Sequence, residues 1–219
     1  MIKALIFDMD GLMLDTERVK LKYRNMVKKD LGLDYENDLL MSETFGKTST
    51  EIRQIYIDKY GKDYPFEEIS KRSKTLWKEH VNKYGVPVKK GLLDLLKYIK
   101  DNEYKIGVAT STYEDETKYL LKEANIIHYF DMIVTGDQVV HSKPYPDLYL
   151  KAAELLSISP EDCLALEDSP NGVNSAFRAG MKVIMVPDLI KPNGELKGIV
   201  NYIVGSLDDV VPILKNKLI

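Results

Sequence analysis

The sequence predicts an α/β protein in which a parallel sheet, covered by helices on both faces, carries an all-helical insertion after its first strand. From residue 91 onward, short apolar runs alternate with helical patterns, which is typical of right-handed strand–helix–strand crossovers. Residues 16–86 show helical periodicity and no strand pattern. We therefore expect a Rossmann-like core of residues 1–15 and 87–219, and a helical cap domain of residues 16–86.

The core elements follow from local patterns along the chain. The strands are expected at residues 4–7, 105–109, 132–134, 163–166, 183–186 and 202–204. Helices are expected at residues 92–99, 117–123, 148–156 and 172–179, and from residue 207 onward. The strands are short, continuous apolar runs, as expected when helices bury both faces of a sheet.

The cap segment carries three apolar stripes at helical spacing, separated by turn residues near Gly32 and at 61–65. The stripes are Val19, Tyr23, Met26 and Val27; Ile52, Ile55, Tyr56 and Tyr60; and Ile69, Leu76, Trp77, Val81 and Tyr84. We interpret these side chains as the core of the cap rather than as a binding surface.

The composition limits the classes of function. The 219 residues are 44% hydrophobic and 30% charged, with a net charge of -3, which fits a globular protein without a basic surface for nucleic acid. No apolar run reaches transmembrane length, no secretory signal is evident, and the single Cys163 excludes an internal disulfide. We expect a cytoplasmic monomer with a small-molecule substrate and no nucleic-acid or membrane partner.

The first strand ends in a pair of acids. Asp8 follows the apolar run at residues 4–7, and Asp10 comes next, beside Gly11. Ligands of open parallel sheets bind at this end of the strands. Two ionised carboxylates about 4 Å apart repel by about 4 kcal/mol at an effective dielectric near 20. The pair therefore suggests a divalent metal, although two aspartates in an ordinary turn would look the same.

Other polar groups stand next to further strands. Residues 110–112 (Thr-Ser-Thr) follow one strand, Glu167 and Asp168 end another, and Lys143 lies in a short segment that two prolines make rigid. Because parallel strands point the same way, we expect these groups at one edge of the sheet. They would supply acids for a cation, and hydroxyls and one lysine for an anion such as phosphate.

Each of these signals also has a purely structural interpretation. Ser111 or Thr112 is well placed to begin a capping box for the following helix, which has acids three residues further on. Lys143 could be one of many solvated lysines. Glu167 and Asp168 could simply favour the dipole of the next helix.

Taken together and in this order, the motifs resemble those of the haloacid dehalogenase superfamily of phosphotransferases. Residues 8–11 (DMDG) look like the first family motif, Thr110 the second, Lys143 the third and Glu167 with Asp168 the fourth. The stretch LEDSPNGVNSAFRAGM at residues 166–181 is especially specific. The insertion looks like the cap of the subfamily that contains β-phosphoglucomutase and small sugar-phosphate phosphatases.

The resemblance implies a phosphatase that forms an aspartyl-phosphate on Asp8 and hydrolyses it with water. Mg²⁺ would bind to Asp8, to the backbone carbonyl of Asp10 and to Asp168, with Glu167 nearby or acting through water. Asp10 would protonate the leaving alcohol and later deprotonate the attacking water.

The same resemblance assigns residues to the substrate. Thr110 and the neighbouring Ser111 and Thr112 would hold phosphate oxygens, and Lys143 would offset charge on the phosphoryl group in the transition state. In the cap, the expected contacts are Lys20 and Lys47, together with Tyr23, Phe45 and Gly46. The cap would close over the site and select substrates.

The activity expected is hydrolysis of small phosphomonoesters, with sugar phosphates as the substrate class. A phosphosugar mutase is the alternative, but resemblance to β-phosphoglucomutase calls for a His where this chain has Lys20, and for an Arg in the cap loop at 45–49, which has none. A non-catalytic phosphoacceptor is a third interpretation, although receiver domains of that kind lack a helical insertion.

Overall fold

The computed structural model describes residues 1–33 and 49–219, and it confirms the expected α/β fold. Six parallel strands form a sheet in the order β3-β2-β1-β4-β5-β6. The strands are β1 (Ala4–Phe7), β2 (Lys105–Ala109), β3 (Met132–Val134), β4 (Cys163–Glu167), β5 (Lys182–Met185) and β6 (Tyr202–Ile203). The four residues of β1 are all buried because β2 and β4 pair with it on either side.

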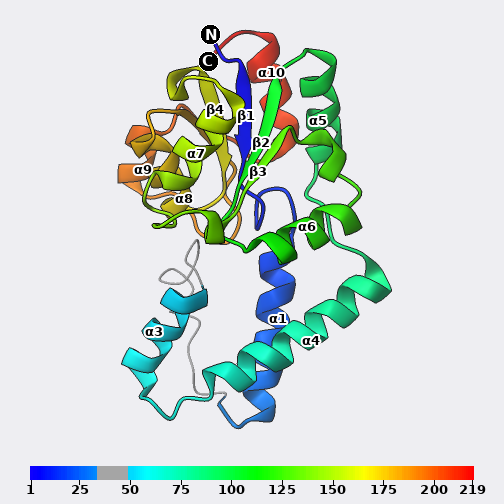
Figure 1. Cartoon of the computed structure of the whole chain (residues 1–219), viewed down its shortest axis with the longest axis vertical. Coiled ribbons are helices and arrows are strands. Elements are labelled where there is room, and N and C mark those ends of the chain that lie inside the picture. The colour runs from blue at the N-terminus through cyan, green and yellow to red at the C-terminus, as the bar shows by residue number, and fades with distance from the viewer. Residues whose placement is uncertain (34–48) are drawn as a thin grey trace.

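Helices cover both faces of this sheet (Figure 1). One face carries α5 (Leu92–Asp101), α6 (Glu114–Glu123) and α10 (Val210–Lys215), and the other carries α7 (Asp147–Leu156), α8 (Pro170–Arg178) and α9 (Gly194–Ile199). Short 3₁₀ turns complete the core at η2 (Ile127–Tyr129), η3 (Gly136–Gln138), η4 (Pro160–Asp162) and η5 (Leu207–Asp209). The chain termini lie close together at the end of the sheet away from α1.

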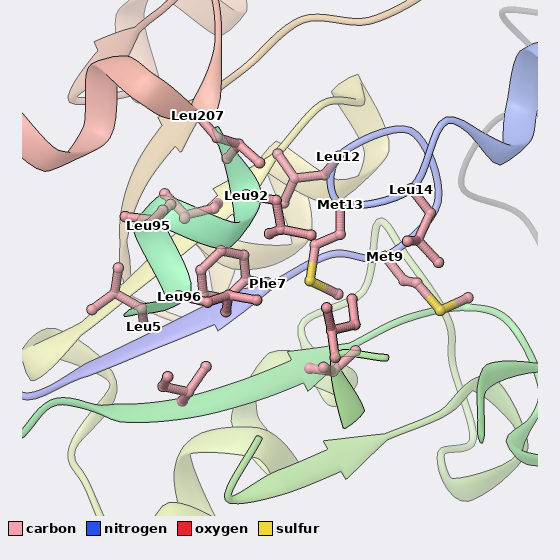
Figure 2. Close-up of a cluster of buried hydrophobic side chains, with 14 of the residues drawn as sticks. Leu5, Phe7, Met9, Leu12, Met13, Leu14, Leu92, Leu95, Leu96 and Leu207 are labelled. Carbon is pink, nitrogen blue, oxygen red and sulfur yellow. The ribbon is translucent and has the colours of Figure 1, made fainter. Parts of the chain in front are cut away.

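Alternation along the strands divides the core into two hydrophobic clusters. Leu5 and Phe7 of β1 point to one face, where they join the leucines of α5, as Figure 2 shows. Ala4 and Ile6 point to the other face and pack with residues of α7 and α8. Because both faces are filled, β1 is held firmly, and the residue that follows it has a fixed position.

The inserted segment folds as helices in its described part: α1 (Thr16–Asp30), α3 (Ser49–Tyr60) and α4 (Phe66–Tyr84). Helices α1 and α4 pack together, and Val27 and Tyr56 belong to a small aromatic-rich cluster separate from the sheet. Trp77 and Val81 of α4, however, belong to the main core cluster. The two hydrophobic cores are therefore not cleanly separated along the sequence, and the domain boundaries expected at 15/16 and 86/87 stay a prediction.

The two connections between the inserted segment and the sheet run side by side. The N–H of Asp15 donates to the carbonyl of Pro87 (2.8 Å), and the N–H of Lys89 donates to the carbonyl of Met13 (2.9 Å). The start of α1 is thus fixed beside the segment that follows α4. None of the described helices is long and apolar enough to span a membrane.

Several local details differ from the sequence-based expectation; helix α8, for example, begins at Pro170 rather than at residue 172. Helix α9 was not expected, because its six residues are too few to show periodicity; it begins with the Asn193 side chain accepting from the Leu196 N–H. Helix α6 begins at Glu114 rather than at residue 117. The last helix starts at Val210, preceded by the 3₁₀ turn η5 with its own capping box.

Candidate active site

Three carboxylates meet where β1 and β4 end. Asp8 directly follows β1, and its N–H donates to the carbonyl of Leu166 at 3.0 Å, which continues the pairing with β4. Glu167 is the last residue of β4, and Asp168 follows it. One oxygen from each of Asp8, Glu167 and Asp168 lies within 4.8 Å of the others, and all three residues are buried. The sheet therefore concentrates negative charge at one point.

Lys143 reaches into this cluster from the loop before α7. Its ammonium donates to Asp8 and, at 2.6 Å, to Oε1 of Glu167. The side chain is 1% exposed, so the interpretation of Lys143 as a solvated lysine is wrong. The peptide bond between Lys143 and Pro144 is cis. A single buried cation thus lies between two of the three acids.

Burial and mutual repulsion set the charges in the cluster. Burial, with repulsion from Glu167 and Asp10, raises the pKa of Asp8 to about 8, although Lys143 opposes the change. Burial and the charges of Asp8 and Glu167 also raise the pKa of Asp168 well above its ordinary value. Burial lowers the pKa of Lys143, but Asp8 and Glu167 outweigh it and raise the pKa. The cluster therefore has too few positive charges for its carboxylates.

The arrangement around Asp168 fits a divalent cation. Within the described residues its carboxylate has no hydrogen-bond donor or ion-pair partner, although the residue is only 7% exposed. Gly11 makes room for it, because a Cβ at this position would lie 2.2 Å from Oδ2 of Asp168. Gly11 also has a φ of +89°, a conformation that side chains disfavour. An all-oxygen donor set with excess negative charge suits Mg²⁺.

Asp10 turns its carboxylate toward a different set of partners. Its Oδ1 accepts from Thr16 (2.5 Å) and Lys20 (2.9 Å), and its Oδ2 accepts from Thr112 (2.7 Å). Burial alone would raise the pKa of Asp10, but Lys20 and the two hydroxyls outweigh burial and lower it. Asp10 is therefore held as a carboxylate, outside the three-acid cluster.

Lys20 connects the inserted helices to the core beside Asp10. It lies on α1 and, besides Asp10, pairs with Glu116 of α6 at 3.2 Å. Lys74 of α4 approaches the same Glu116 at 4.0 Å. Burial by itself lowers the pKa of Lys20, but its acidic partners Asp10 and Glu116 outweigh burial and raise the pKa. Ion pairs thus connect α1 and α4 of the inserted segment to Glu116 of the core, and Lys20 on α1 also pairs with Asp10, the residue expected to transfer protons.

The hydroxyl segment after β2 lies beside Asp10. Thr110 is buried, and its Oγ1 accepts from the N–H of Thr112 at 3.1 Å. The Thr112 hydroxyl donates to Asp10, and the hydroxyl of Ser142 donates to that of Ser111 (2.7 Å). The alternative interpretation of Ser111 or Thr112 as the start of a capping box is wrong: α6 has Tyr113 at its N-cap and no side-chain cap, and the Thr112 hydroxyl donates to Asp10.

The structure brings most of the sequence-predicted residues into one region, with Glu167 beside Asp8 and Asp168, while the Asp10 side chain pairs with Lys20, Thr16 and Thr112. Lys47, Phe45 and Gly46 lie outside the described residues. The sequence missed Thr16, Glu116 and Tyr149. Tyr149 donates to Oε1 of Glu167 at 2.7 Å. In the sequence it is simply one apolar position of a helix, and its distant partner leaves no local signal.

Comparisons with known proteins agree with this geometry. The chain matches the family of haloacid dehalogenase-like hydrolases over residues 5–186. It is 35% identical to YhcW of Bacillus subtilis over 195 residues (87% of this chain, 86% of that protein). It is 32% identical to a protein of Thermotoga maritima named phosphorylated carbohydrates phosphatase, over 185 residues (84% of each chain). The crystal structure of CbbY from Rhodobacter sphaeroides in complex with phosphate superposes with a TM-score of 0.81 at 26% identity, covering 96% of each chain.

Proposed function

This chain belongs to the haloacid dehalogenase-like hydrolases and is a phosphatase of that family, and from this premise we propose that it hydrolyses small phosphomonoesters through an aspartyl-phosphate, with Mg²⁺ as cofactor. We propose sugar phosphates as the substrate class. The observation that carries the proposal is the buried cluster of Asp8, Glu167 and Asp168, with Lys143 donating to the first two. Asp8 can act as a nucleophile only in its ionised form, and the positive charge of Lys143 favours that form in the buried cluster.

In the first step, an oxygen of Asp8 attacks phosphorus, and the ester oxygen of the substrate leaves. In the second step, water attacks the same phosphorus and releases the Asp8 carboxylate and inorganic phosphate. Lys143 is placed to offset negative charge on the phosphoryl oxygens, because its ammonium already lies against Asp8. Thr110, Ser111 and Thr112 would bind phosphate oxygens at the adjacent end of β2.

Asp8, Asp168 and the backbone carbonyl of Asp10 would hold the metal ion. When bound, Mg²⁺ supplies positive charge that offsets the repulsion between Asp8 and an incoming phosphate. Glu167 lies in the same cluster, but both of its oxygens already accept hydrogen bonds. We therefore assign Asp168, which has no partner within the described residues, as the main acidic ligand beside Asp8.

Asp10 would move the protons. In its ionised state it can accept a proton from the attacking water during the second step. To protonate the leaving alcohol in the first step, it must first gain a proton, and this requires that Lys20 moves away from it. Lys20 and Lys47 would contact the part of the substrate beyond the phosphate, and closure of the cap would place them there.

The test is a panel of sugar phosphates and other phosphomonoesters, assayed with Mg²⁺ and with a chelator. We expect phosphate release that needs the metal and disappears in Asp8→Asn. The exposed Asp63, in the turn between α3 and α4, provides a matched Asp63→Asn control with wild-type activity. Conversion of a hexose 1-phosphate only in the presence of a bisphosphate activator would identify a mutase instead. A stable phosphoryl-Asp8 without turnover would identify a phosphoacceptor.

A further inference from the structure

Tyr149 is a buried side chain in contact with the catalytic cluster that the mechanism above does not use. It lies on α7 and is 0% exposed. Its hydroxyl donates to Oε1 of Glu167 at 2.7 Å, and the same oxygen accepts from Nζ of Lys143 at 2.6 Å. The Tyr149 ring also lies against Lys143, with 5.3 Å between Nζ and the ring centroid. Tyr149 therefore contacts Lys143 directly and also through Glu167.

Glu167 is held on its other side by the start of α8. Its Oε2 accepts from the N–H of Asp168 (3.1 Å) and from the hydroxyl of Ser169 (3.2 Å). Gly172 leaves the space for this arrangement, since a Cβ there would lie 1.9 Å from the Glu167 carboxyl. The carboxylate is thus fixed from both sides, with Tyr149 as its neutral donor on the Lys143 side.

The hydroxyl matters because it shares one oxygen with the lysine. An ammonium has three donors, and two of those of Lys143 go to Asp8 and Glu167. Burial, followed by the Glu167 charge, raises the pKa of Tyr149 well above its ordinary value, so the hydroxyl stays a donor. Without that donor, Oε1 of Glu167 would depend on Lys143 alone and would draw the ammonium away from Asp8.

We propose that Tyr149 is a positioning residue for phosphoryl transfer, which fixes Glu167 and through it the ammonium of Lys143 beside Asp8. Tyr149 itself does not touch the reacting atoms. The expected effect on kcat rests on the proposed phosphatase function. Because Lys143 acts on the transition state, loss of the hydroxyl should lower kcat and leave KM almost unchanged.

The experiment compares Tyr149→Phe with the wild type and with Tyr202→Phe. Tyr202 also loses one hydroxyl hydrogen bond, to the carbonyl of Leu218 (2.9 Å), but on the far edge strand of the sheet. We expect kcat to fall about tenfold in Tyr149→Phe, with KM changed less than about twofold, and wild-type values in the control. In a Lys143→Met background the Tyr149→Phe change should have no further effect on kcat.

Two measurements separate this role from a structural one. Circular dichroism gives the folded fraction of each variant. If Tyr149→Phe is unstable, an osmolyte that favours the folded state allows kcat to be measured for the folded variant. A crystal structure of Tyr149→Phe should show Lys143 displaced from Asp8, and this readout needs no activity. Absence of phosphatase activity in the wild type would contradict the proposed function alone. A wild-type kcat in folded Tyr149→Phe, or an undisplaced Lys143, would overturn the positioning role.

Discussion

Replacing Asp168 with Asn should make the metal-free protein more stable while removing its response to Mg²⁺. In the metal-free cluster the Asp168 carboxylate faces two acids, Asp8 and Glu167, and one cation, Lys143, with the acidic oxygens within 4.8 Å of one another. At an effective dielectric near 20, each such repulsion costs about 3 kcal/mol. At a pH above about 8, where Asp8 is ionised, one repulsion is balanced by Lys143, so about one remains.

Partial protonation of Asp168 already relieves some of that cost, since its pKa is raised well above the ordinary value. We therefore expect Asp168→Asn to gain about 1–3 kcal/mol, which for a chain of this size corresponds to about 3–10 °C in Tm. Asparagine has nearly the same shape, so the space beside Gly11 stays filled. Function and stability would then oppose each other at this one residue.

The assay is thermal unfolding with and without Mg²⁺ at a pH above about 8, where Asp8 is ionised, followed by circular dichroism. The wild type should gain about 5–10 °C in Tm at saturating Mg²⁺, because binding at about a hundred times the Kd contributes about 2.7 kcal/mol. Asp168→Asn should start higher and gain almost nothing from the metal, and the exposed Asp63→Asn control should behave as the wild type. A lower metal-free Tm in Asp168→Asn, or an undiminished Mg²⁺ response, would refute the electrostatic reasoning.

Three further predictions concern the same site. Asp8→Asn should lower kcat by at least about a thousandfold while the circular dichroism spectrum stays that of the wild type; a wild-type rate would exclude Asp8 as nucleophile. The stabilisation by Mg²⁺ should be larger near pH 8 than near pH 5, because the folded-state pKa values of Asp8 and Asp168 are raised. The metal-free protein holds protons on these acids at low pH and loses stability as the pH rises toward about 8. A bound cation replaces the protons and restores that stability. Lys20→Met should move the acid limb of the kcat/KM profile, which reports the free enzyme, to higher pH, because Lys20 keeps the pKa of Asp10 low; an unchanged limb would show that Asp10 is not the base that this limb reports.

Sequence patterns predicted the sheet because each strand can be recognised from a short stretch of the sequence. The apolar runs at β1, β2 and β4 are bounded by turn residues and are buried on both faces, except for the exposed Lys105 that begins β2, so pattern and environment agree. Helix α9 escaped prediction because a helix of six residues is shorter than the window in which periodicity can be recognised.

For the site, the sequence predicted which residues would lie close together, but it did not predict which ion pairs and hydrogen bonds they would form. Lys143 is held by two acids at the ends of other strands, Asp8 after β1 and Glu167 as the last residue of β4, and nothing in the local sequence of Lys143 indicates these partners. Thr112 lies three residues before an acid, as a capping residue would, yet its hydroxyl donates to Asp10, which lies after another strand. Contacts of this kind depend on the strand order, which a single sequence leaves open.

The pairing of Lys20 with Asp10 connects the position of the cap to proton transfer. The partners of Lys20 lie on the core, and Lys20 itself lies on α1 of the inserted segment. While the two are paired, Asp10 is a base and cannot donate a proton to a leaving alcohol. A substrate that enters between α1 and the strand ends would separate them and allow Asp10 to gain a proton. The acid step would then be available only with substrate bound. For the base step Asp10 is already ionised, because it has given its proton to the leaving alcohol, and it can accept one from the attacking water.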